Sequence, residues 1–518
     1  MTTPVPKRGG EYAEGIIGQP SYINPLLSQM SEADADLSQL IYSGLFKYDA
    51  EGNIANDIAE GYEVSEDRLT YTVYLRKDVL WHDGQSLIAD DVAFTVAILQ
   101  DPAYRSPLRL SWQGVQVRKE DDYKIIFTLS TPFAGFINNL TIGILPKHVW
   151  ENVPAEKFSL TEFNLHPIGS GPFSFVDLSK DSAGNVLSYE LQSFPGYYGG
   201  EPFVPKITFN FYPDGDSAVA ALNKKEVKGL GNVPLENLEK IQSQKAIQLH
   251  ELNIPRYFAV FFNQTKSFPL ADDEVRKALA LAIDRDAMIQ TVLQGKGTPV
   301  SSSFLPHMSA FNGDAERYNF NIDEAKKKLD DAGWKVSETD GVRKKDDHEL
   351  SFTMYTTDWP ELSRAADVLQ MQWEQIGVRV KVERLAVSDI QQNRIRPREY
   401  EALLFGQMTT LDPDLYSFWH SSQKQDPGFN FALLDDKKVD GLLDEIRQNG
   451  KADERIAKLK ELQSVLAEKN LAIFLFSPHY VYPVDIEMQG FDMQNLNAPS
   501  WRFAKVNTWY LKTKRIWK

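Results

Sequence analysis

The residues that commonly carry out catalysis are present in this chain, but they lack the spacing that catalysis requires. Its eight histidines include no i, i+4 pair with an intervening glutamate, as in a zinc hydrolase helix, and the chain has no cysteine. Neither Gly-Lys pair, at Gly295 and Gly450, follows a glycine at the distance of a phosphate-binding loop. Ser170 has Ile168 and Pro172 where a nucleophile elbow has glycines, so a tight turn is favoured. We therefore expect a protein that is not an enzyme and has no cofactor and no metal.

Two other features allow either a functional or a structural role. Asp412 and Asp414 flank a proline and could form a carboxylate pair or contact calcium, but turn chemistry explains the same sequence. Aromatic residues make up 12% of the chain, which suits a cleft that binds by stacking, although most aromatic side chains belong to cores. Trp373 lies on an apolar helical stripe and is expected to pack. Trp359 lies in a loop and is equally consistent with ligand contact.

Length and composition indicate a globular protein of several lobes. A chain of 518 residues exceeds the size at which one hydrophobic core keeps growing, so a cleft between lobes is a natural binding site. The net charge is −16 and no basic block could neutralise a run of phosphates, so we expect no nucleic acid partner. No run of 18 apolar residues is present, which predicts no membrane span.

The two ends of the chain are polar. Residues 1–10, MTTPVPKRGG, lack an apolar signal core and are typical of a polar tether that follows a removed export signal or lipid anchor. The last residues interleave basic and aromatic side chains: Trp509, Lys512, Lys514, Arg515, Trp517 and Lys518. This cluster is consistent with contact with a membrane surface, and a solvated tail is the simpler interpretation.

Hydrophobic periodicity predicts an α/β protein. Period-two alternation predicts strands at residues 69–75, 124–130 and 207–212. Apolar residues at helical spacing predict helices at 87–100, 272–294, 363–376, 434–448 and 452–470. Asp90 is placed to cap the first of these helices, and Gly295 to end the second. The helix at 363–376 leads into an alternating strand at 378–382, which forms an α/β unit.

Several segments resemble family 5 of the bacterial extracellular solute-binding proteins, the dipeptide-, oligopeptide- and nickel-binding group. The strongest match, at residues 40–96, contains GLFKYDAEGNIANDIAEGYEVSEDRLTYTVYLRKDVLWHDGQSLIADDV. The family has gLf, P-x-lA-x-x-w-x-v-s-x-d, t-y-t-f-x-L-R and f-x-D-G-x-p-l-t-A-x-D-V in this order. HPIGSGPFSF, DDEVRKALALAIDRDAM and LQMQWEQIGVRVKV extend the resemblance over nearly the whole chain. Within these motifs, Trp81, Asp83 and Gly84 are expected to form turns, and Arg276 to form an ion pair.

The resemblance implies a two-lobed periplasmic-binding-protein fold of α/β class, of type II and the large peptide-binding class, with a subdomain inserted in the first lobe. The first lobe would comprise residues 1–45, 166–256 and 480–518, with the inserted subdomain at 46–165, and the second lobe residues 257–479. Two crossing segments, near residues 253–259 and 476–483, would join the lobes.

The implied function is that of the substrate-binding component of an ABC-type importer. Such a protein closes on a peptide, here an oligopeptide, and delivers it to the permease subunits of the transporter. The resemblance implies a monomer in the periplasm or lipid-anchored at the cell surface. An oligosaccharide or a nickel chelate is the alternative ligand, and a hydrolase is the remaining alternative from another class.

In such proteins three loops contact the ligand, here residues 19–31, 356–360 and 405–419, partly by pairing their main chain with an extended peptide. The candidate site residues are Tyr22, Asn24, Met30, Ser31, Asp358, Trp359, Gly406, Gln407, Met408, Thr409, Asp412 and Trp419. The main chain of Met30, Gly406 and Met408 is expected to carry the pairing, and Trp359 and Trp419 would suit stacking on sugars.

The chain departs from the peptide-binding pattern at the charged anchors. Peptide-binding relatives have Trp and Asp where this chain has Gln407 and Thr409, and the aspartate grips the peptide's amino terminus. Dipeptide binders present an arginine in the second loop, where this chain has Thr356 and Asp358 among its residues. The usual anchors are therefore missing, strict dipeptide specificity is not expected, and Asp412 or Asp358 would be the substitute partner of a free ammonium group.

Overall fold

The computed structural model describes residues 2–242, 245–315 and 318–517. The chain forms two compact units: unit 1 contains residues 1–253 and 480–518, and unit 2 contains residues 254–479. The chain therefore enters unit 2 after Asn253 and leaves it after His479. The lobe boundaries and the inserted subdomain expected from the sequence stay predictions.

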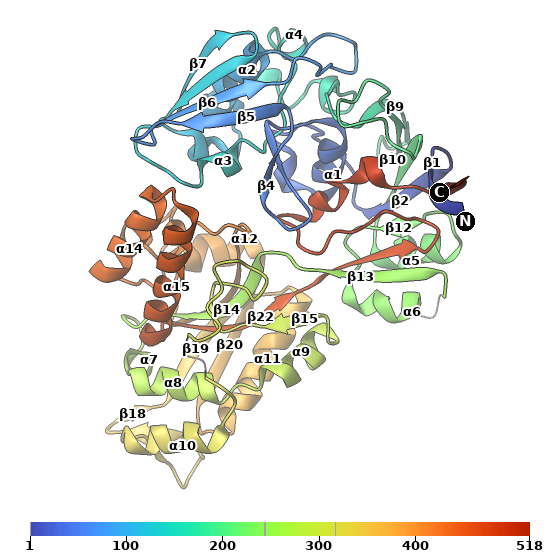
Figure 1. Ribbon diagram of the computed structural model, residues 1–518. Helices are drawn as coiled ribbons and strands as arrows, with labels where there is room; N and C mark the ends of the chain where they lie inside the picture. Colours follow the sequence, from blue (N-terminus) through green and yellow to red (C-terminus); the bar gives the residue numbers. More distant parts are fainter. Residues whose placement is uncertain (1, 243–244, 316–317, 518) are drawn as a thin grey trace. The chain divides into compact units, whose positions relative to one another are not determined.

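Unit 1 is built on a seven-stranded mixed sheet (Figure 1). The strand order is β13 (Ile247–Leu252), β23 (Tyr480–Asp485), β12 (Gly229–Leu230), β2 (Glu11–Ile17), β11 (Lys206–Tyr212), β10 (Val186–Ser193) and β9 (Phe173–Lys180). β2 runs parallel to β11 and β12, and the other neighbours are antiparallel. Helices α1 (Glu32–Ile41), α5 (Gly215–Asn223) and α6 (Leu238–Gln242) accompany this sheet.

A second sheet of unit 1 lies within residues 46–165. Its order is β5 (Ala59–Val64), β6 (Thr70–Leu75), β8 (Lys124–Thr128) and β7 (Gln116–Asp121), beside a β3–β4 pair (Phe46–Tyr48, Ile54–Asn56). Its helices are α2 (Ala89–Gln100), α3 (Phe136–Asn139) and α4 (Lys147–Trp150). The cap predicted at Asp90 is wrong. Asp91 accepts hydrogen bonds from the amides of Ile88 (3.0 Å) and Lys147 (2.8 Å), while Asp90 pairs with Lys119 (2.6 Å).

Unit 2 is built on a six-stranded sheet, and its helices lie in the segments that connect the strands. The order is β15 (Gly297–Pro299), β22 (Ala472–Pro478), β14 (Arg256–Phe262), β21 (Ala402–Met408), β19 (Ser351–Thr357) and β20 (Arg379–Leu385). A small sheet contains β16 (Lys335–Val336), β17 (Arg343–Lys345) and β18 (His348–Glu349). The helices are α7 (Phe268–Ala271), α8 (Asp273–Leu281), α9 (Arg285–Leu293), α10 (Ile322–Asp331), α11 (Pro360–Glu374), α12 (Val387–Ile390), α13 (Tyr416–Trp419), α14 (Lys437–Gln448) and α15 (Ala452–Lys469).

The long helix predicted at residues 272–294 is wrong, because the structure divides it into α8 and α9. Asp284 has extended backbone torsion angles, and its carboxylate accepts a hydrogen bond from the amide of Ala287 (2.9 Å), so a new helix begins there. Arg276 on α8 forms the expected ion pair, with Asp273 (3.1 Å). Trp373 on α11 packs as expected, since its indole is buried and donates to the carbonyl of Leu279 (2.9 Å).

A fully buried charge cluster lies in unit 1. The guanidinium of Arg502 contacts the carboxylates of Asp36 (2.8 and 2.5 Å) and Glu14 (3.1 Å), and all three side chains are at most 1% exposed. The hydroxyls of Tyr12 (2.8 Å) and Tyr482 (3.0 Å) donate to Glu14. The cluster thereby joins β2, α1, β23 and the 3₁₀ helix at Pro499–Phe503.

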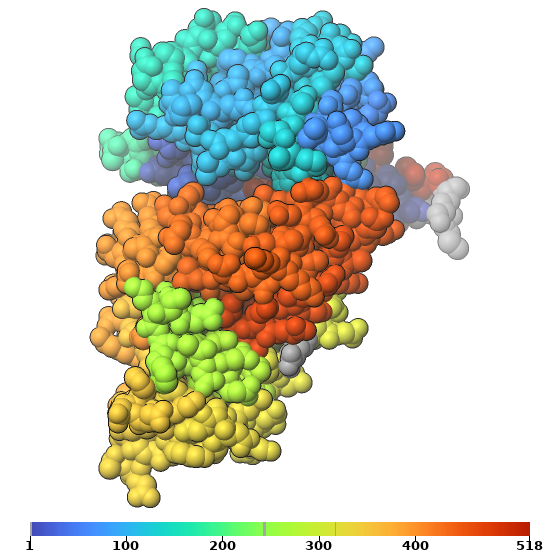
Figure 2. All heavy atoms as spheres, turned by 90° about the vertical axis from the view of Figure 1, so that its left-hand side faces the viewer, coloured from blue at the N-terminus to red at the C-terminus, as the bar shows by residue number. Residues whose placement is uncertain are grey.

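The two ends of the chain pair with each other. β1 (Thr2–Lys7) runs antiparallel to β24 (Lys512–Trp517), so these two strands lie side by side (Figure 1 and Figure 2). The start of the chain is therefore a strand rather than the expected tether. The two tryptophans of the C-terminal cluster differ sharply, because Trp509 is 1% exposed and Trp517 is 83% exposed.

Candidate ligand-binding site

The first candidate loop, in unit 1, is fixed to the start of α1. The buried carboxylate of Asp34 accepts hydrogen bonds from the amides of Ser21 (2.7 Å) and Tyr22 (2.8 Å), and its burial raises its pKa. Ser31 is the N-cap of α1 and accepts a hydrogen bond from the amide of Asp34 (3.4 Å). The loop presents Tyr22 and Met30 to solvent, with Met30 81% exposed.

Asn24 lies in the same loop but faces inward. It is fully buried, its side-chain oxygen accepts a hydrogen bond from the amide of Leu26 (3.0 Å), and its amide group donates to Asn164 (3.3 Å). These contacts support the loop conformation, and they leave Tyr22 and Met30 as the loop's accessible candidates.

A cavity of about 960 Å³ lies beside these two side chains, entirely within unit 1. Most of its lining is apolar or aromatic, with one positive and one negative side chain: Tyr22, Leu27, Met30, Pro102, Ala103, Tyr104, Arg105, Pro107, Ala155, Glu156 and Ser159. Sequence reasoning missed the segments 102–107 and 155–159. The available signal was weak, since an Asp-Pro pair at Asp101 marks only a turn, in which the Asp101 carboxylate accepts from the amide of Ala103 (2.8 Å).

In unit 2, the candidate residues 406–408 lie at the end of β21, where successive residues face opposite sides of the sheet. Gln407 is buried, accepts a hydrogen bond from the hydroxyl of Tyr257 (2.6 Å) and donates to the carbonyl of Phe429 (2.9 Å). Met408 is 43% exposed. A Cβ atom at Gly406 would lie 2.6 Å from the ring of Phe258, so glycine allows this ring to cover the strand. Gln407 is therefore a core residue.

The main chain of β21 has an open side at its end. The amide of Thr409 donates to the carbonyl of Pro255 (2.8 Å), which continues the pairing with β14. Because alternate residues of a strand direct their polar groups to opposite sides, Gly406 and Met408 direct theirs away from β14, toward β19. In the part of the chain that the structure describes, β19 pairs with β21 only up to the Tyr355–Leu403 position. Among the described residues, no strand therefore pairs with the main-chain polar groups of Gly406 and Met408 on this side.

The second candidate loop follows β19 and adjoins this open side. The hydroxyl of the buried Thr356 donates to the carbonyl of Leu404 (3.0 Å), one residue beyond the last position of β21 that pairs with β19. The amide of Asp358 donates to the carbonyl of Leu385 (3.1 Å), and its carboxylate is exposed. Trp359, at the start of α11, is 49% exposed and is available to a ligand.

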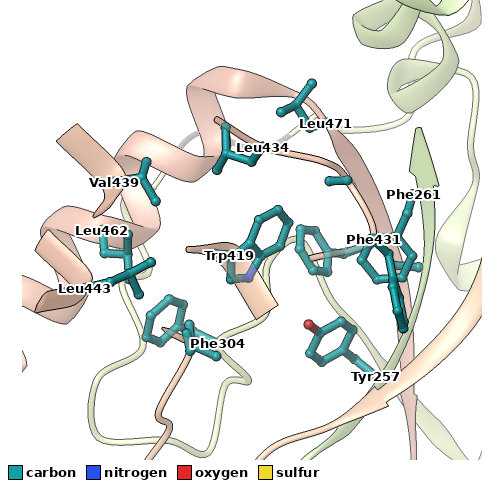
Figure 3. Close-up of a cluster of buried hydrophobic side chains, with 14 of the residues drawn as sticks. Tyr257, Phe261, Phe304, Trp419, Phe431, Leu434, Val439, Leu443, Leu462 and Leu471 are labelled. Atoms are coloured by element: carbon teal, nitrogen blue, oxygen red, sulfur yellow. The ribbon is translucent and has the colours of Figure 1, made fainter. Parts of the chain in front are cut away.

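The remaining candidates of the third loop make contacts within unit 2. Thr409 is buried, and the guanidinium of Arg455 contacts the carboxylate of Asp412. Asp414 forms a separate ion pair with Arg447, at 3.0 Å. Trp419 is 3% exposed and lies in the hydrophobic core (Figure 3), where its ring centre is 6.3 Å from that of Phe474. Its expected stacking on a ligand conflicts with this burial, so we leave Trp419 out of the site.

Two further observations concern the class of protein. Among the described residues, no group of three or more His, Asp or Glu side chains is arranged to hold a metal ion. No helix within residues 2–242, 245–315 and 318–517 has the length and apolar character that a membrane crossing requires.

Comparison with known proteins agrees with the resemblance seen in the sequence. The model of the bacterial extracellular solute-binding proteins, family 5 middle region, matches residues 53–429. The oligopeptide-binding protein AppA of Bacillus subtilis is 29% identical over 96% of this chain and 93% of its own length. Its structure with a nonapeptide aligns with a TM-score of 0.75 at 27% identity, covering 98% of this chain and 100% of that one. NikZ of Campylobacter jejuni, solved with Ni(L-His), aligns with a TM-score of 0.77 at 26% identity, covering 96% and 99%.

Proposed function

Because the chain belongs to family 5 of the bacterial extracellular solute-binding proteins, we propose that it is the substrate-binding component of an ABC-type importer and that its ligand is an oligopeptide. The ligand pairs with the end of β21 as an added strand and is delivered to permease subunits. The protein acts outside the cytoplasm, in the periplasm or at the cell surface, and works as a monomer.

The open side of β21 is the observation that supports a peptide most directly. Gly406 and Met408 together offer N–H donors and C=O acceptors with the spacing of a strand, which is the complement of an extended peptide main chain. A sugar or a nickel chelate has no regular series of such groups. Recognition through main-chain groups depends little on side chains, so the protein is expected to accept peptides of varied sequence.

The cavity of unit 1 supports a preference for apolar side chains in the ligand. Tyr22, Leu27 and Met30 form one part of its lining, and a volume of about 960 Å³ exceeds that of any single side chain. The exposed apolar surface of Met30 and Tyr22 loses contact with water when a ligand side chain covers it, which favours binding. Asp358 and Trp359 in unit 2 are proposed as additional contacts.

Single N-methylation along a bound peptide tests the proposed pairing. The peptides that co-purify with the protein are identified by mass spectrometry, and one of them is resynthesised with one N-methyl group at each position in turn. Each methyl group removes a donor, and the loss of a hydrogen bond in a buried site typically costs about 1–3 kcal/mol, or roughly 5- to 150-fold in affinity. Calorimetry is expected to show large losses at alternate positions and small losses between them. Uniform losses, or co-purification of sugars or a nickel chelate instead of peptides, would contradict the proposal.

Blocking the ends of the peptide is expected to change its affinity little. Thr409 and Thr356, at the positions of the charged anchors, are buried and donate to main-chain carbonyls, and Asp412 is already paired with Arg455. Loss of a buried ion pair costs about 2–5 kcal/mol, or roughly 30- to several-thousand-fold in affinity. Calorimetry with free, acetylated and amidated forms of one peptide is therefore expected to differ by less than about fivefold.

Two matched variants identify the anchor if acetylation proves costly. Asp412→Asn and Asp358→Asn each remove one charge from a different candidate loop while keeping the size of the side chain. A true anchor would make the affinities of free and acetylated peptides equal in one variant only, with an unchanged melting temperature of the ligand-free protein. A lower melting temperature with equal weakening of both peptides would identify a structural residue.

A further inference from the structure

The paired ends of the chain form a basic ribbon on an acidic protein. We use the term terminal ribbon for β1 and β24, residues 2–7 and 512–517. It contains Lys7, Lys512, Lys514 and Arg515 and no acidic residue, whereas the whole chain has a net charge of −16. All six residues of β24 are exposed, and among the described residues none of these four basic side chains forms an ion pair within 4.0 Å.

The register of the terminal ribbon groups these side chains on two faces. Residues directly opposite each other in an antiparallel pair share a face. Lys7 is opposite Lys512, and Val5 is opposite Lys514, so one face combines three lysines with apolar groups, including Ile516. Arg515 and Trp517 lie on the other face. Both faces therefore combine positive charge with an apolar side chain.

The edge of the terminal ribbon that β1 forms is unsuited to pairing with another strand. β1 contains Pro4 and Pro6, which have no N–H group, and proline is tolerated in a strand where that missing donor faces the open edge. The edge beyond β1 therefore lacks donors at these two positions, as in strands that resist the addition of a partner strand. Strand addition beyond β1 is therefore disfavoured, and the exposed faces of the ribbon are available surfaces.

We propose that the terminal ribbon binds the surface of an anionic lipid membrane. Lysine and arginine side chains near such a surface are attracted by the lipid head groups, and tryptophan is favoured at the boundary between head groups and acyl chains. Trp517, at 83% exposure, is the most exposed of the large hydrophobic side chains among the described residues, and it lies on the same face of its strand as Arg515. An isolated two-stranded ribbon is only marginally stable in water, so contact with a lipid surface would also stabilise it.

The acidic remainder of the protein does not prevent this contact. At physiological ionic strength, charges separated by more than about 8 Å of solvent are largely screened from each other, so the membrane responds to the charges nearest to it. Each basic side chain at an anionic surface typically strengthens binding about fivefold. Three of them together therefore account for a factor on the order of a hundred. The contact should weaken as salt is added, because it is electrostatic.

Vesicle sedimentation with the full chain tests the proposal. Vesicles of phosphatidylcholine alone are compared with vesicles of phosphatidylcholine and phosphatidylglycerol, at low and high salt. The protein is expected to sediment with the anionic vesicles only, and less at high salt. The variant Lys512→Gln/Lys514→Gln/Arg515→Gln is expected to lose on the order of a hundredfold in affinity. Trp517→Ala is expected to weaken binding, and Lys512→Arg/Lys514→Arg to preserve it.

A matched variant tests whether vesicle binding depends on the location of the basic residues or only on the net charge of the protein. Lys157→Gln/Lys180→Gln/Lys224→Gln removes three exposed basic residues of unit 1 outside the terminal ribbon and is expected to bind as the unaltered protein does. Equal loss in this variant would contradict the proposal, because net charge alone would then explain binding. No sedimentation with anionic vesicles, or sedimentation only when permease protein is present in the vesicles, would overturn it. Unchanged melting temperatures show that each variant is folded.

Discussion

Replacing Arg502 by methionine is expected to lower the free energy of unfolding of unit 1 by about 3–5 kcal/mol at neutral pH. Arg502 is fully buried, and its guanidinium contacts the buried carboxylates of Asp36 and Glu14. Methionine fills much of the volume but leaves both carboxylates in the core without a positive charge. A buried charge without a partner is among the most costly changes in a folded protein.

The loss is expected to depend on pH. Burial raises the pKa of Glu14 from 4.5 to about 6, although Arg502 and Tyr12 oppose the shift, and burial also raises the pKa of Asp36. Between pH 4.5 and about 6 the folded chain therefore binds more protons at Glu14 than the unfolded chain, so stability falls as the pH rises. Without Arg502 both carboxyl groups keep their protons to higher pH. The variant is thus expected to be closest to the unaltered protein at about pH 5, and furthest from it above about pH 7.

The effect is measured by urea unfolding of the full chain at about pH 5 and about pH 7. Hydrogen exchange of the β2 amides reports the unfolding of unit 1. The matched control removes all three charges: Glu14→Met/Asp36→Leu/Arg502→Met. Hydrophobic side chains of similar volume in place of a buried ion cluster often change stability little, so this variant is expected to recover most of the loss. An equal loss at both pH values, or no recovery in the neutral variant, would show that packing of Arg502 rather than its charge determines stability.

The sequence predicted most of the secondary structure because hydrophobic periodicity reports burial directly. The strand at 69–75 and the helices at 363–376 and 452–470 are present as β6, α11 and α15, with every end within three residues of the predicted one. The errors have local causes. A cap at Asp284 interrupts an otherwise continuous helical stripe, and pairing between the two ends of the chain cannot be seen in the pattern of either end.

The candidate site was less predictable from the sequence, because the place of a residue in the sequence does not reveal whether its side chain is buried or which side of its strand is paired. The sequence placed Gln407 and Trp419 among the ligand contacts, and the structure buries both, since each side chain has partners far away in the chain. The open side of β21 depends on where β19 ends, which only the register reveals. The cavity beside Tyr22 combines three separate segments with little pattern of their own.

Replacing Gly169, in the motif HPIGSGPF, by alanine is also expected to lower the free energy of unfolding strongly. A Cβ atom there would lie 1.9 Å from the carbonyl oxygen of Ile41, the last residue of α1, and main-chain atoms cannot turn aside as a side chain does. Gly169 also donates to Nδ1 of His82 (3.2 Å) and accepts from the amide of His82 (2.8 Å). Gly169→Ala must therefore displace the turn and weaken these hydrogen bonds, with an expected loss of about 3 kcal/mol or more.

The pKa of His82 reports displacement of the turn at Gly169 independently of the overall stability of the protein. Its Nε2 donates to the carbonyl of Gly171 (3.1 Å) while its Nδ1 accepts from Gly169, so the ring is held neutral between the two glycines. Burial lowers its pKa from 6.5 to about 4. If Gly169→Ala displaces the turn, water reaches the ring, and its pKa, measured by NMR, is expected to move back toward the value of an exposed histidine.

Gly61→Ala is the matched control for Gly169→Ala. It makes the same substitution in unit 1, on β5, where no heavy atom lies within 4 Å of the added Cβ atom and the backbone torsion angles suit any residue. There the added methyl group only restricts the unfolded chain, so stability is expected to stay the same or rise by up to about 1 kcal/mol, with the pKa of His82 unchanged. Similar stabilities of the two variants would mean that α1 moves away from the turn at little cost, and that the glycines of HPIGSGPF are not required by this close contact.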